Sequence, residues 1–247
     1  MEYQNLTIIG SSHIAQESVL EITKAIQELK PDIIAVELDY RRYYALLYHK
    51  HRKLSIWDIR KIGFKGYVFA VIGQYVQKTL GKYAGMEPGS DMLTAIKLAK
   101  QNNIHVALID QDIEITLSRF SASLTWREKW NFIVDLFRAI FFRKSEMKAL
   151  GLESFDLRKV PSKQLIEKLM RKLKKRYPLV YKVLITERNV VVANNLHGLM
   201  QEQKDKKILA VVGAGHTDDL IGLLKKYGSN DVDLVDPRIS YSFKTNV

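Results

Sequence analysis

Short apolar runs alternate along the chain with segments whose apolar residues recur at helical spacing. A short apolar run bounded by turn residues is typical of a strand that is buried on both faces. Runs of this kind occupy residues 6–9, 32–38, 104–109, 208–212 and 232–235. Helical spacing predicts helices over residues 16–30, 91–102 and 178–203, with a short helix ending near residue 227. This alternation predicts an α/β fold with a central, mostly parallel sheet and flanking helices.

Two longer stretches between the strands have a helical pattern. They cover about residues 43–90 and 115–205, and neither a fixed-period repeat nor a low-complexity linker divides the chain. Because a single α/β domain often reaches about 250 residues, we expect one domain over residues 1–247 with a mostly helical insertion between its strands.

One predicted helix of this insertion, residues 124–147, carries a broad apolar stripe. The stripe contains Trp126, Trp130, Ile133, Val134, Phe137 and Phe141, and it is widened by Phe132 and Phe142. The simplest expectation is that this helix packs over the sheet beside the helical segment 66–77. If the stripe is exposed, it would line a groove for an apolar peptide, form an interface between copies or rest on a membrane. Of these, a homodimer is the simplest, and we predict one.

Positive charge is concentrated in one segment. The chain has 39 Lys and Arg against 27 Asp and Glu, a net charge of +12 at pH 7. Nine basic residues and one acid between Arg158 and Tyr177 supply +8 of that charge. A solvated helix face is the ordinary explanation, and an acidic partner, a nucleic acid or a membrane surface is the next. Aromatic residues are not interleaved with these charges, so we expect weak, salt-sensitive binding to acidic vesicles and no specific nucleic acid partner.

The absence of cysteine limits the available chemistry. It excludes disulfides, thiolate metal sites and a cysteine nucleophile. The N-terminal residues show no signal-peptide pattern, and no uncharged stretch reaches the ~20 residues that a membrane span needs. These features predict a cytoplasmic protein that is at most peripheral at the membrane.

Ionisable side chains follow four of the predicted strands, at the point where each strand ends. These residues are His13, Glu37, Asp110 and His216. Because ligand sites in open parallel sheets lie beyond the carboxyl ends of the strands, we expect the four side chains to converge. The two histidines also share a pattern of apolar strand, glycine, two small residues and histidine. This repetition favours a common site over two incidental strand ends.

A carboxylate interrupts the apolar stripe of the predicted helix 178–203. Leu184 and Val191 share a face with Glu187, and Arg188 follows directly. Burial of a carboxylate is costly unless the group is paired. Glu187 is therefore either part of an ion pair, with Arg188 or another base, or a member of the site.

Taken together, the motifs of the chain resemble those of a known family. They are Gly10–His13, Glu37-Leu38-Asp39 with Arg42, Tyr43 and Leu46, Pro88–Met92, Leu108–Ile113 with Thr116 and Leu117, Glu187-Arg188-Asn189, and Gly213–His216. In this order, over nearly the whole chain, they are similar to the TraB/PrgY pheromone-shutdown family, which is grouped with the Tiki proteases and with erythromycin-esterase-like and ChaN-like proteins. The resemblance implies an α/β domain with paired Gly-x-x-His motifs and a metal-dependent peptidase activity, which is established for the Tiki proteins. Asn189 stands where the family often has an acid.

The resemblance carries over to His13, Glu37, Arg42, Glu187, Arg188 and His216. It leads us to expect a metal-dependent hydrolase that acts on a peptide or a similar amide, such as a signalling peptide. His13, Glu37 and His216 would hold one divalent ion, with Zn²⁺, Mn²⁺ and Co²⁺ all compatible. Glu187 would be the general base, and Arg188 or Arg42 would stabilise the oxyanion. Asp110 would orient a ligating histidine.

A binding protein is the alternative. Such a protein would sequester a peptide or a small hydrophobic ligand without cleaving it. The same crevice would then be an anion pocket built from Arg42, Arg188 and the two histidines. Cleavage that a chelator abolishes distinguishes the enzyme from this alternative.

Overall fold

A five-stranded sheet forms the centre of the part of the chain that the structure describes. The computed structural model describes residues 1–11, 16–48, 55–84, 89–123, 125–141 and 163–229. The strands are β1 (Glu2–Tyr3), β2 (Leu6–Ser11), β3 (Ile33–Val36), β4 (His105–Leu108) and β5 (Ile208–Gly213). Their order is β1-β2-β5-β3-β4, with β1 antiparallel to β2 and all other neighbours parallel. The predicted α/β class is confirmed.

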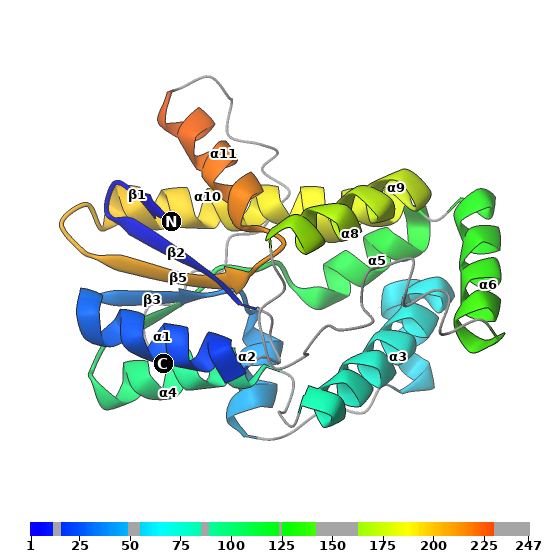
Figure 1. Cartoon of the computed structure of the whole chain (residues 1–247), viewed down its shortest axis with the longest axis horizontal. Coiled ribbons are helices and arrows are strands. Elements are labelled where there is room, and N and C mark those ends of the chain that lie inside the picture. Colours follow the sequence, from blue (N-terminus) through cyan, green and yellow to red (C-terminus); the bar gives the residue numbers. More distant parts are fainter. Residues whose placement is uncertain (12–15, 49–54, 85–88, 124, 142–162, 230–247) are drawn as a thin grey trace.

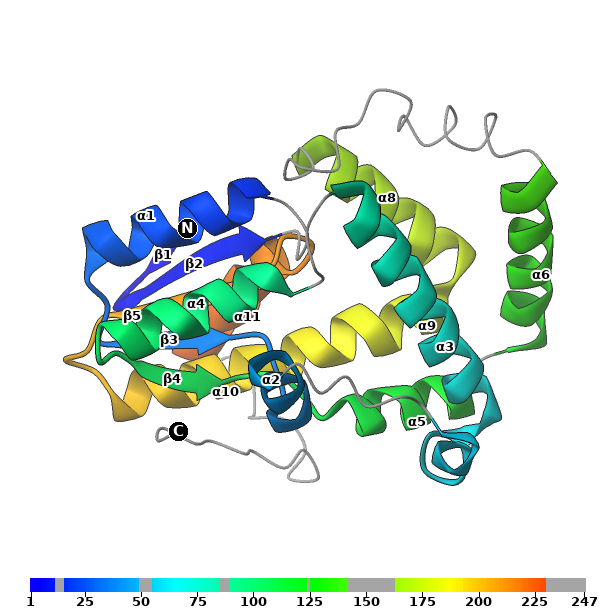
Figure 2. The ribbon, with the colours of Figure 1, turned by 90° about the horizontal axis from the view of Figure 1, so that it is seen from below.

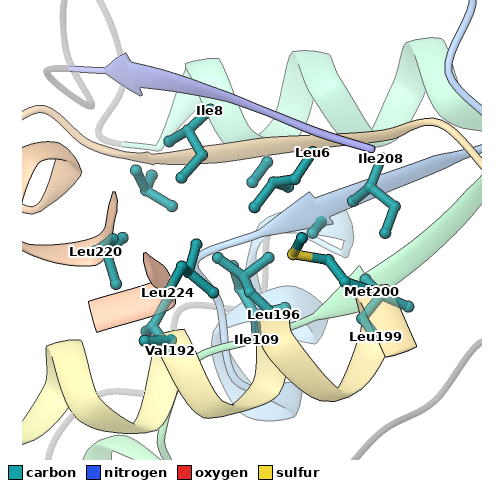
Figure 3. Close-up of a cluster of buried hydrophobic side chains, with 14 of the residues drawn as sticks. Leu6, Ile8, Ile109, Val192, Leu196, Leu199, Met200, Ile208, Leu220 and Leu224 are labelled. Atoms are coloured by element: carbon teal, nitrogen blue, oxygen red, sulfur yellow. The ribbon is translucent and has the colours of Figure 1, made fainter. Parts of the chain in front are cut away.

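Helices cover both faces of the sheet (Figure 1). Helices α1 (Gln16–Leu29) and α4 (Ser90–Gln101) lie on one face, and α10 (Glu187–Glu202) and α11 (Thr217–Gly228) lie on the other. Because successive side chains of a strand point to opposite faces, Leu209 packs toward α1 and α4 while Ile208 packs toward α10 and α11. Figure 3 shows this second cluster, in which leucines of α10 and α11 meet the sheet. The strands are therefore buried on both sides, as their uninterrupted apolar sequences predicted.

The remaining helices extend beyond the carboxyl edge of the sheet (Figure 2). They are α2 (Tyr40–Leu47), the 3-10 turn η1 (Ile56–Asp58), α3 (Ile59–Ala84), α5 (Ile113–Ser123), α6 (Trp126–Phe141), α8 (Lys163–Arg176), α9 (Pro178–Tyr181) and the π-helical turn η2 (Lys182–Thr186). Phe120 of α5, Val180 of α9 and Val183 of η2 form a small buried core among them, and side chains of α3 and α8 pack against it. The expected insertion at 115–205 thus includes one helix, α10, that covers the sheet instead of extending from it.

Helix α3 is kinked where it meets α5. Gly63 has a φ of 72°, and a Cβ atom there would clash with Ser121 Oγ. Only glycine combines this backbone conformation with so close an approach. The predicted helical region therefore bends around α5, and periodicity alone did not predict the bend.

Four predicted strands are confirmed, and one observed strand was not predicted. The expected strand at 232–235 lies outside the described residues. Strand β1 was missed because two residues carry no periodic signal; its pairing with β2 only becomes possible after the turn at Gln4, which has a positive φ. Within the described part of the chain, no helix combines the length and apolarity that crossing a bilayer requires.

Helix α6 does not pack over the sheet, so the simplest expectation for its aromatic stripe was wrong. It stands at the far end of the helical region, away from the strands (Figures 1 and 2). Trp126 and Trp130 are 83% and 67% exposed. The physical reason is that polar side chains of α6 bind the segment around α8 and α9, while the described tryptophans of its stripe are exposed.

Candidate functional site

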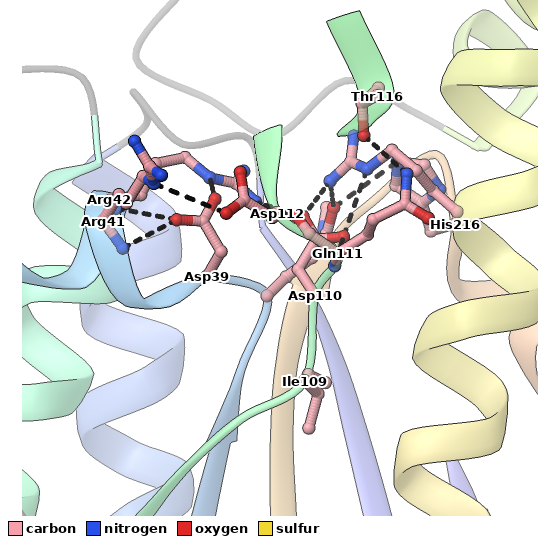
Figure 4. Close-up of polar contacts among 12 residues, drawn as sticks. Asp39, Arg41, Arg42, Ile109, Asp110, Gln111, Asp112, Thr116 and His216 are labelled. Carbon is pink, nitrogen blue, oxygen red and sulfur yellow. Dashed lines mark hydrogen bonds and ion pairs between the residues drawn. The ribbon is translucent and has the colours of Figure 1, made fainter. Parts of the chain in front are cut away.

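The carboxyl ends of the parallel strands bring predicted site residues from distant parts of the sequence together. Val36, the last residue of β3, is aligned with residues near the ends of β4 and β5. Glu37 follows β3 directly, while Asp110 and His216 follow β4 and β5 by two and three residues. Figure 4 shows the polar side chains that gather above these strand ends.

Two guanidinium groups and three carboxylates form an ion-pair cluster at this edge. Arg188 Nη2 donates to Glu37 Oε1 at 2.6 Å and also donates to Asp110 Oδ2. Arg42 donates from Nη2 to Asp110 Oδ2 and from Nε to Asp39 Oδ2, both at 2.5 Å. Asp110 therefore binds both arginines, and its side chain is fully buried. With the carboxylates ionised, the cluster has one negative charge in excess, which favours a cation nearby.

Burial and ion pairing act in opposite directions on Asp110. Burial raises the pKa of its carboxyl group, but the charges of Arg188 and Arg42 and their hydrogen bonds outweigh burial and hold this pKa well below its ordinary value. Burial likewise lowers the pKa of both guanidinium groups, whereas the neighbouring carboxylates raise it above its ordinary value. All three groups are therefore charged at neutral pH.

The second oxygen of Glu37 is held by the turn after β5. The backbone N–H of Gly213 donates to Glu37 Oε2 at 2.5 Å. A Cβ atom at Gly10 would lie 2.9 Å from Thr217 Cγ2 and 3.0 Å from Ala214 Cα, so the close approach of this turn to β2 requires glycine. The first glycine of each Gly-x-x-His segment therefore has a defined role: one admits the turn, and the other binds the carboxylate.

A chain of polar side chains orients His216. Asn189 Nδ2 donates to Asp219 Oδ2 at 3.0 Å, which leaves Asn189 Oδ1 facing His216 Nδ1 at 2.5 Å. Because an amide oxygen only accepts, Nδ1 carries a proton, and in the neutral imidazole Nε2 carries the lone pair. Nε2 lies 3.7 Å from Glu37 Oε1. Two acceptor atoms of the neutral imidazole and the carboxylate therefore face each other.

Other residues of the family-like motifs support the cluster (Figure 4). Asp39 caps the N-terminus of α2, where its side chain accepts from the backbone N–H of Arg42 at 3.0 Å. The same carboxylate also binds the guanidinium group of Arg42. The backbone N–H of Gln111 donates to Asp110 Oδ1 at 2.7 Å. The side-chain amide of Gln111 donates to Thr116 Oγ1 at 2.9 Å. These contacts fix the directions in which the charged groups point.

The π-helical turn η2 sets the orientation of the residues that follow it. A π turn contains an additional residue and therefore shifts the phase of the helix beyond it. Directly after η2, Arg188 contacts the ion-pair cluster and Asn189 contacts His216. Glu187 contacts α5 instead, where its Oε2 accepts from Arg119 Nε at 2.7 Å.

The structure thus brings five of the predicted site residues together: Glu37, Arg42, Asp110, Arg188 and His216. Within the described residues, Glu187 forms its ion pair with Arg119, and its role as general base stays a prediction. His13 lies outside the described residues. Nδ1 of His216 donates to Asn189 Oδ1, and the expected role of Asp110 in orienting a ligating histidine stays a prediction.

Three residues of the site were missed by the sequence analysis: Asp39, Asn189 and Asp219. Asp39 could have been found from its place before the apolar positions of α2, which is a helix-capping signal. Asn189, which stands where the family often has an acid, was given no role, although an amide oxygen can also accept the imidazole N–H. No sequence signal links Asp219 to Asn189, because their contact depends on the packing of α11 against α10.

Comparison with known proteins shows the family to which the chain belongs. The profile of the TraB/PrgY/gumN family matches residues 2–230. The chain therefore belongs to this family, as its motifs predicted.

Relatives occur in archaea and in animals. An uncharacterized protein of Methanocaldococcus jannaschii is 33% identical over 238 residues, which are 94% of this chain and 56% of that protein. A TraB domain-containing protein of Homo sapiens is 23% identical over 251 residues, covering 92% of this chain and 63% of the human protein. The corresponding bovine protein is 22% identical over 235 residues, covering 85% of this chain and 59% of its own length. The chain thus spans less than two thirds of the length of these relatives.

Proposed function

We propose that the chain is a metal-dependent hydrolase that acts on a peptide or a similar amide. The observation that carries this proposal is the arrangement of His216 and Glu37. Asn189 holds the proton on Nδ1, so the lone pair of Nε2 is directed to the side where Glu37 Oε1 lies, 3.7 Å away. Two acceptors in this arrangement repel each other unless a cation or a proton lies between them. A histidine whose other ring nitrogen is bound in this way is the usual form of a metal ligand.

The donor set fits a divalent cation. Bonds of about 2.1 Å from such an ion to nitrogen and to oxygen together span about 4.2 Å, so donors 3.7 Å apart can share one ion. Among the described residues, no group of three or more histidine or carboxylate donors is arranged so that it could hold a metal ion. The third predicted ligand, His13, follows Ser11 by two residues, and Ser11 is paired with Gly213 at the end of β5. Zn²⁺, Mn²⁺ and Co²⁺ suit these ligands.

The residues of the cluster have defined tasks in this proposal. A bound divalent ion would supply a nucleophilic water at neutral pH and polarise the scissile carbonyl. Arg188 and Gly213 hold the two oxygens of Glu37 in place. Both arginines are bound to carboxylates, so they serve first to orient these groups, and a role in oxyanion binding requires that one N–H turn toward substrate. Glu187 is the candidate base, and it would act after releasing Arg119.

Metal content and peptide cleavage test the proposal together. After incubation with Zn²⁺, Mn²⁺ or Co²⁺, we expect about one ion per chain by mass spectrometry. The His13→Ala/His216→Ala double variant should bind none. His105→Ala/His197→Ala is the matched control, because both of its histidines lie outside the site. The metal-loaded protein should cleave members of a peptide library, and a chelator should abolish cleavage.

The possible failures separate the two functions. Equal metal binding by the His13→Ala/His216→Ala variant would reject the ligand set. Metal binding together with tight peptide binding and no cleavage would reject the hydrolase and assign the crevice to sequestration. Cleavage that persists with chelator would reject metal dependence.

Asn189 provides a second, positioning test. Replacement by leucine removes the acceptor for Nδ1–H, so we expect metal affinity and cleavage to fall about 10–100-fold. Asn194→Leu is a matched control, because this buried amide lies on the same helix and neither of its polar side-chain atoms has a hydrogen-bond partner within the described structure. Asn189→Asp should retain more activity than Asn189→Leu, since a carboxylate also accepts from Nδ1. Equal losses in the leucine variants at positions 189 and 194 would contradict the orienting role.

A further inference from the structure

Helix α6 attaches to the protein through its polar face. Glu128 is almost completely buried, and its Oε1 accepts from the backbone N–H groups of Leu179 at 2.8 Å and Val180 at 3.4 Å, in the first turn of α9. One turn further along α6, the Asn131 side chain donates to the carbonyl oxygen of Arg176 at 3.1 Å. Positions 128 and 131 are three residues apart, so they lie on the same side of the helix.

Asp135 completes this inward face. Its two oxygens accept from Arg176 Nη2 at 2.6 Å and Nε at 2.5 Å, and Oδ2 also accepts from the Tyr177 hydroxyl at 2.7 Å. The paired guanidinium forms two parallel hydrogen bonds, which fixes the orientation of α6 on the C-terminal end of α8. Among the described side chains of α6, the hydrogen bonds and ion pair to the segment around α8 and α9 are therefore made by an amide and two carboxylates.

The apolar stripe of α6 consequently faces away from these contacts. Trp126 and Trp130 are four residues apart, which places them on one side of the helix, and they are 83% and 67% exposed. Helical spacing continues the same stripe through positions 133, 137 and 141, whose side chains are not described. At the two tryptophans, this arrangement is the reverse of an ordinary surface helix, which buries its apolar side and exposes its polar side.

The outward charges on α6 are positive. Both acids in the helix, Glu128 and Asp135, are used in the inward contacts, whereas Arg127 and Arg138 are exposed. An exposed stripe with two tryptophans is therefore bordered by cations. Tryptophan combines a large apolar ring with a polar N–H and is favoured at the boundary between lipid and water.

Helix α8 adds further positive charge beside α6. Its apolar side faces inward: Met170 lies 3.0 Å from the position of a Cβ atom at Gly215, and Leu173 packs against the helical core. Its exposed residues include Lys168, Arg171, Lys172, Lys174 and Lys175, with Glu167 as the acid among them. The ion pair between Asp135 and Arg176 joins this basic helix to α6.

We propose that α6 and α8 form a docking surface for an anionic lipid membrane. Trp126 and Trp130 would enter the interface, and the exposed cations of both helices would bind lipid headgroups. A second copy of the chain is a poorer occupant, because it would bring two strongly basic surfaces together. The proposal does not depend on the hydrolase activity, since none of these residues belongs to the candidate site.

The insertion of the two tryptophans is directly measurable. The chain has three tryptophans, so Trp57→Phe leaves only those of α6. With vesicles of phosphatidylcholine and phosphatidylserine, this variant should show a blue shift of its emission and quenching by lipids brominated on the acyl chains. Vesicles of phosphatidylcholine alone should produce neither change. Trp126→Ala/Trp130→Ala should weaken co-sedimentation with the anionic vesicles at least tenfold, whereas Trp57→Ala, which removes another exposed tryptophan, should not.

Two matched double variants test whether vesicle binding requires the positive charge of α8. Lys172→Ala/Lys175→Ala should weaken anionic vesicle binding several-fold, and binding should fall steeply between about 0.05 M and about 0.5 M salt. Lys225→Ala/Lys226→Ala removes two exposed lysines from α11 and should have no such effect. Circular dichroism establishes that each variant is folded.

Three outcomes would overturn the proposal. The first is equal binding to neutral and anionic vesicles, and the second is binding to anionic vesicles without quenching by brominated lipid. The third is a dimer that dissociates on Trp126→Ala/Trp130→Ala in a protein that does not bind vesicles. This last result would assign the stripe to a second copy.

Discussion

Replacement of Arg188 by alanine is expected to lower the free energy of unfolding by about 3–5 kcal/mol at pH 7. Arg188 binds Glu37 and Asp110, and the Asp110 side chain is fully buried. Without this guanidinium group, the carboxylates of Glu37 and Asp110 remain close together, and only Arg42 balances the charge of the buried Asp110 side chain. Removing one partner of a buried ion pair lowers stability far more than removing one partner of an exposed pair, because the charge left behind in the interior is not solvated. Urea denaturation of both proteins measures the difference.

A matched variant separates burial from charge. Arg119→Ala also removes an arginine that binds a carboxylate, but this side chain is 56% exposed, so the cost should be less than about 1 kcal/mol. The loss of unfolding free energy in Arg188→Lys should lie between the losses in the two alanine variants, because an ammonium group keeps the positive charge but cannot form the forked contacts of a guanidinium group. Equal losses for Arg188→Ala and Arg119→Ala would contradict a buried, coupled cluster.

At acid pH, Arg188→Ala should lower the free energy of unfolding by less than it does at neutral pH. The pKa of Asp110 is depressed in the folded protein, so its contribution to stability is complete above the ordinary value of 3.8 and is lost as the pH falls through the folded-state pKa. In the Arg188→Ala variant this pKa should rise, because the loss of Arg188 leaves burial opposed only by Arg42. The difference in stability between the two proteins should therefore be constant near neutral pH and narrow below about pH 4. A difference that stays constant to pH 3 would show that the charge of Asp110 is not involved.

The Glu37→Gln variant is expected to lose metal binding and peptide cleavage together. An amide has the shape of the carboxylate but supplies one oxygen instead of two, and its NH₂ group must face either Arg188 or the N–H of Gly213, which are both donors. We therefore also expect a loss of stability of about 1–3 kcal/mol, the cost of a buried donor left without an acceptor. Mass spectrometry of the metal-loaded protein and urea denaturation measure the two effects.

The two effects of Glu37→Gln can be told apart by comparison with Arg188→Ala. Both variants weaken the cluster, but only Glu37→Gln removes a proposed metal ligand. At a temperature where both are folded, Arg188→Ala should retain more metal than Glu37→Gln. Glu114→Gln, which alters a partly exposed carboxylate bound to Arg41, is the control and should change neither property. Full metal occupancy in folded Glu37→Gln would remove Glu37 from the ligand set and leave the stability prediction intact.

Local sequence pattern predicted the parts of the fold that depend on periodicity and capping. The apolar runs before Glu37 and Asp110 had to be buried strands, because residues of both faces are apolar. Parallel strands place their carboxyl ends at one edge, so the meeting of Glu37, Asp110 and His216 was also predictable. The helix from Pro178 to Glu202 was found for the same reason, although periodicity could not reveal its π-helical turn.

By itself, the sequence determined four of the five described strands, the α/β class, the family and the group of residues at the strand ends. Only the tertiary structure decided which of these residues bind one another. Glu187 contacts Arg119 on another helix instead of its neighbour Arg188, and Asn189 contacts His216, 27 positions away. Helix α6 shows the same limit, since its stripe predicted an apolar contact and its polar face makes the contacts that are observed. The physical reason is that the periodicity of a segment shows which of its sides is apolar and which is polar. What each side contacts depends instead on the packing of segments that are distant in the sequence.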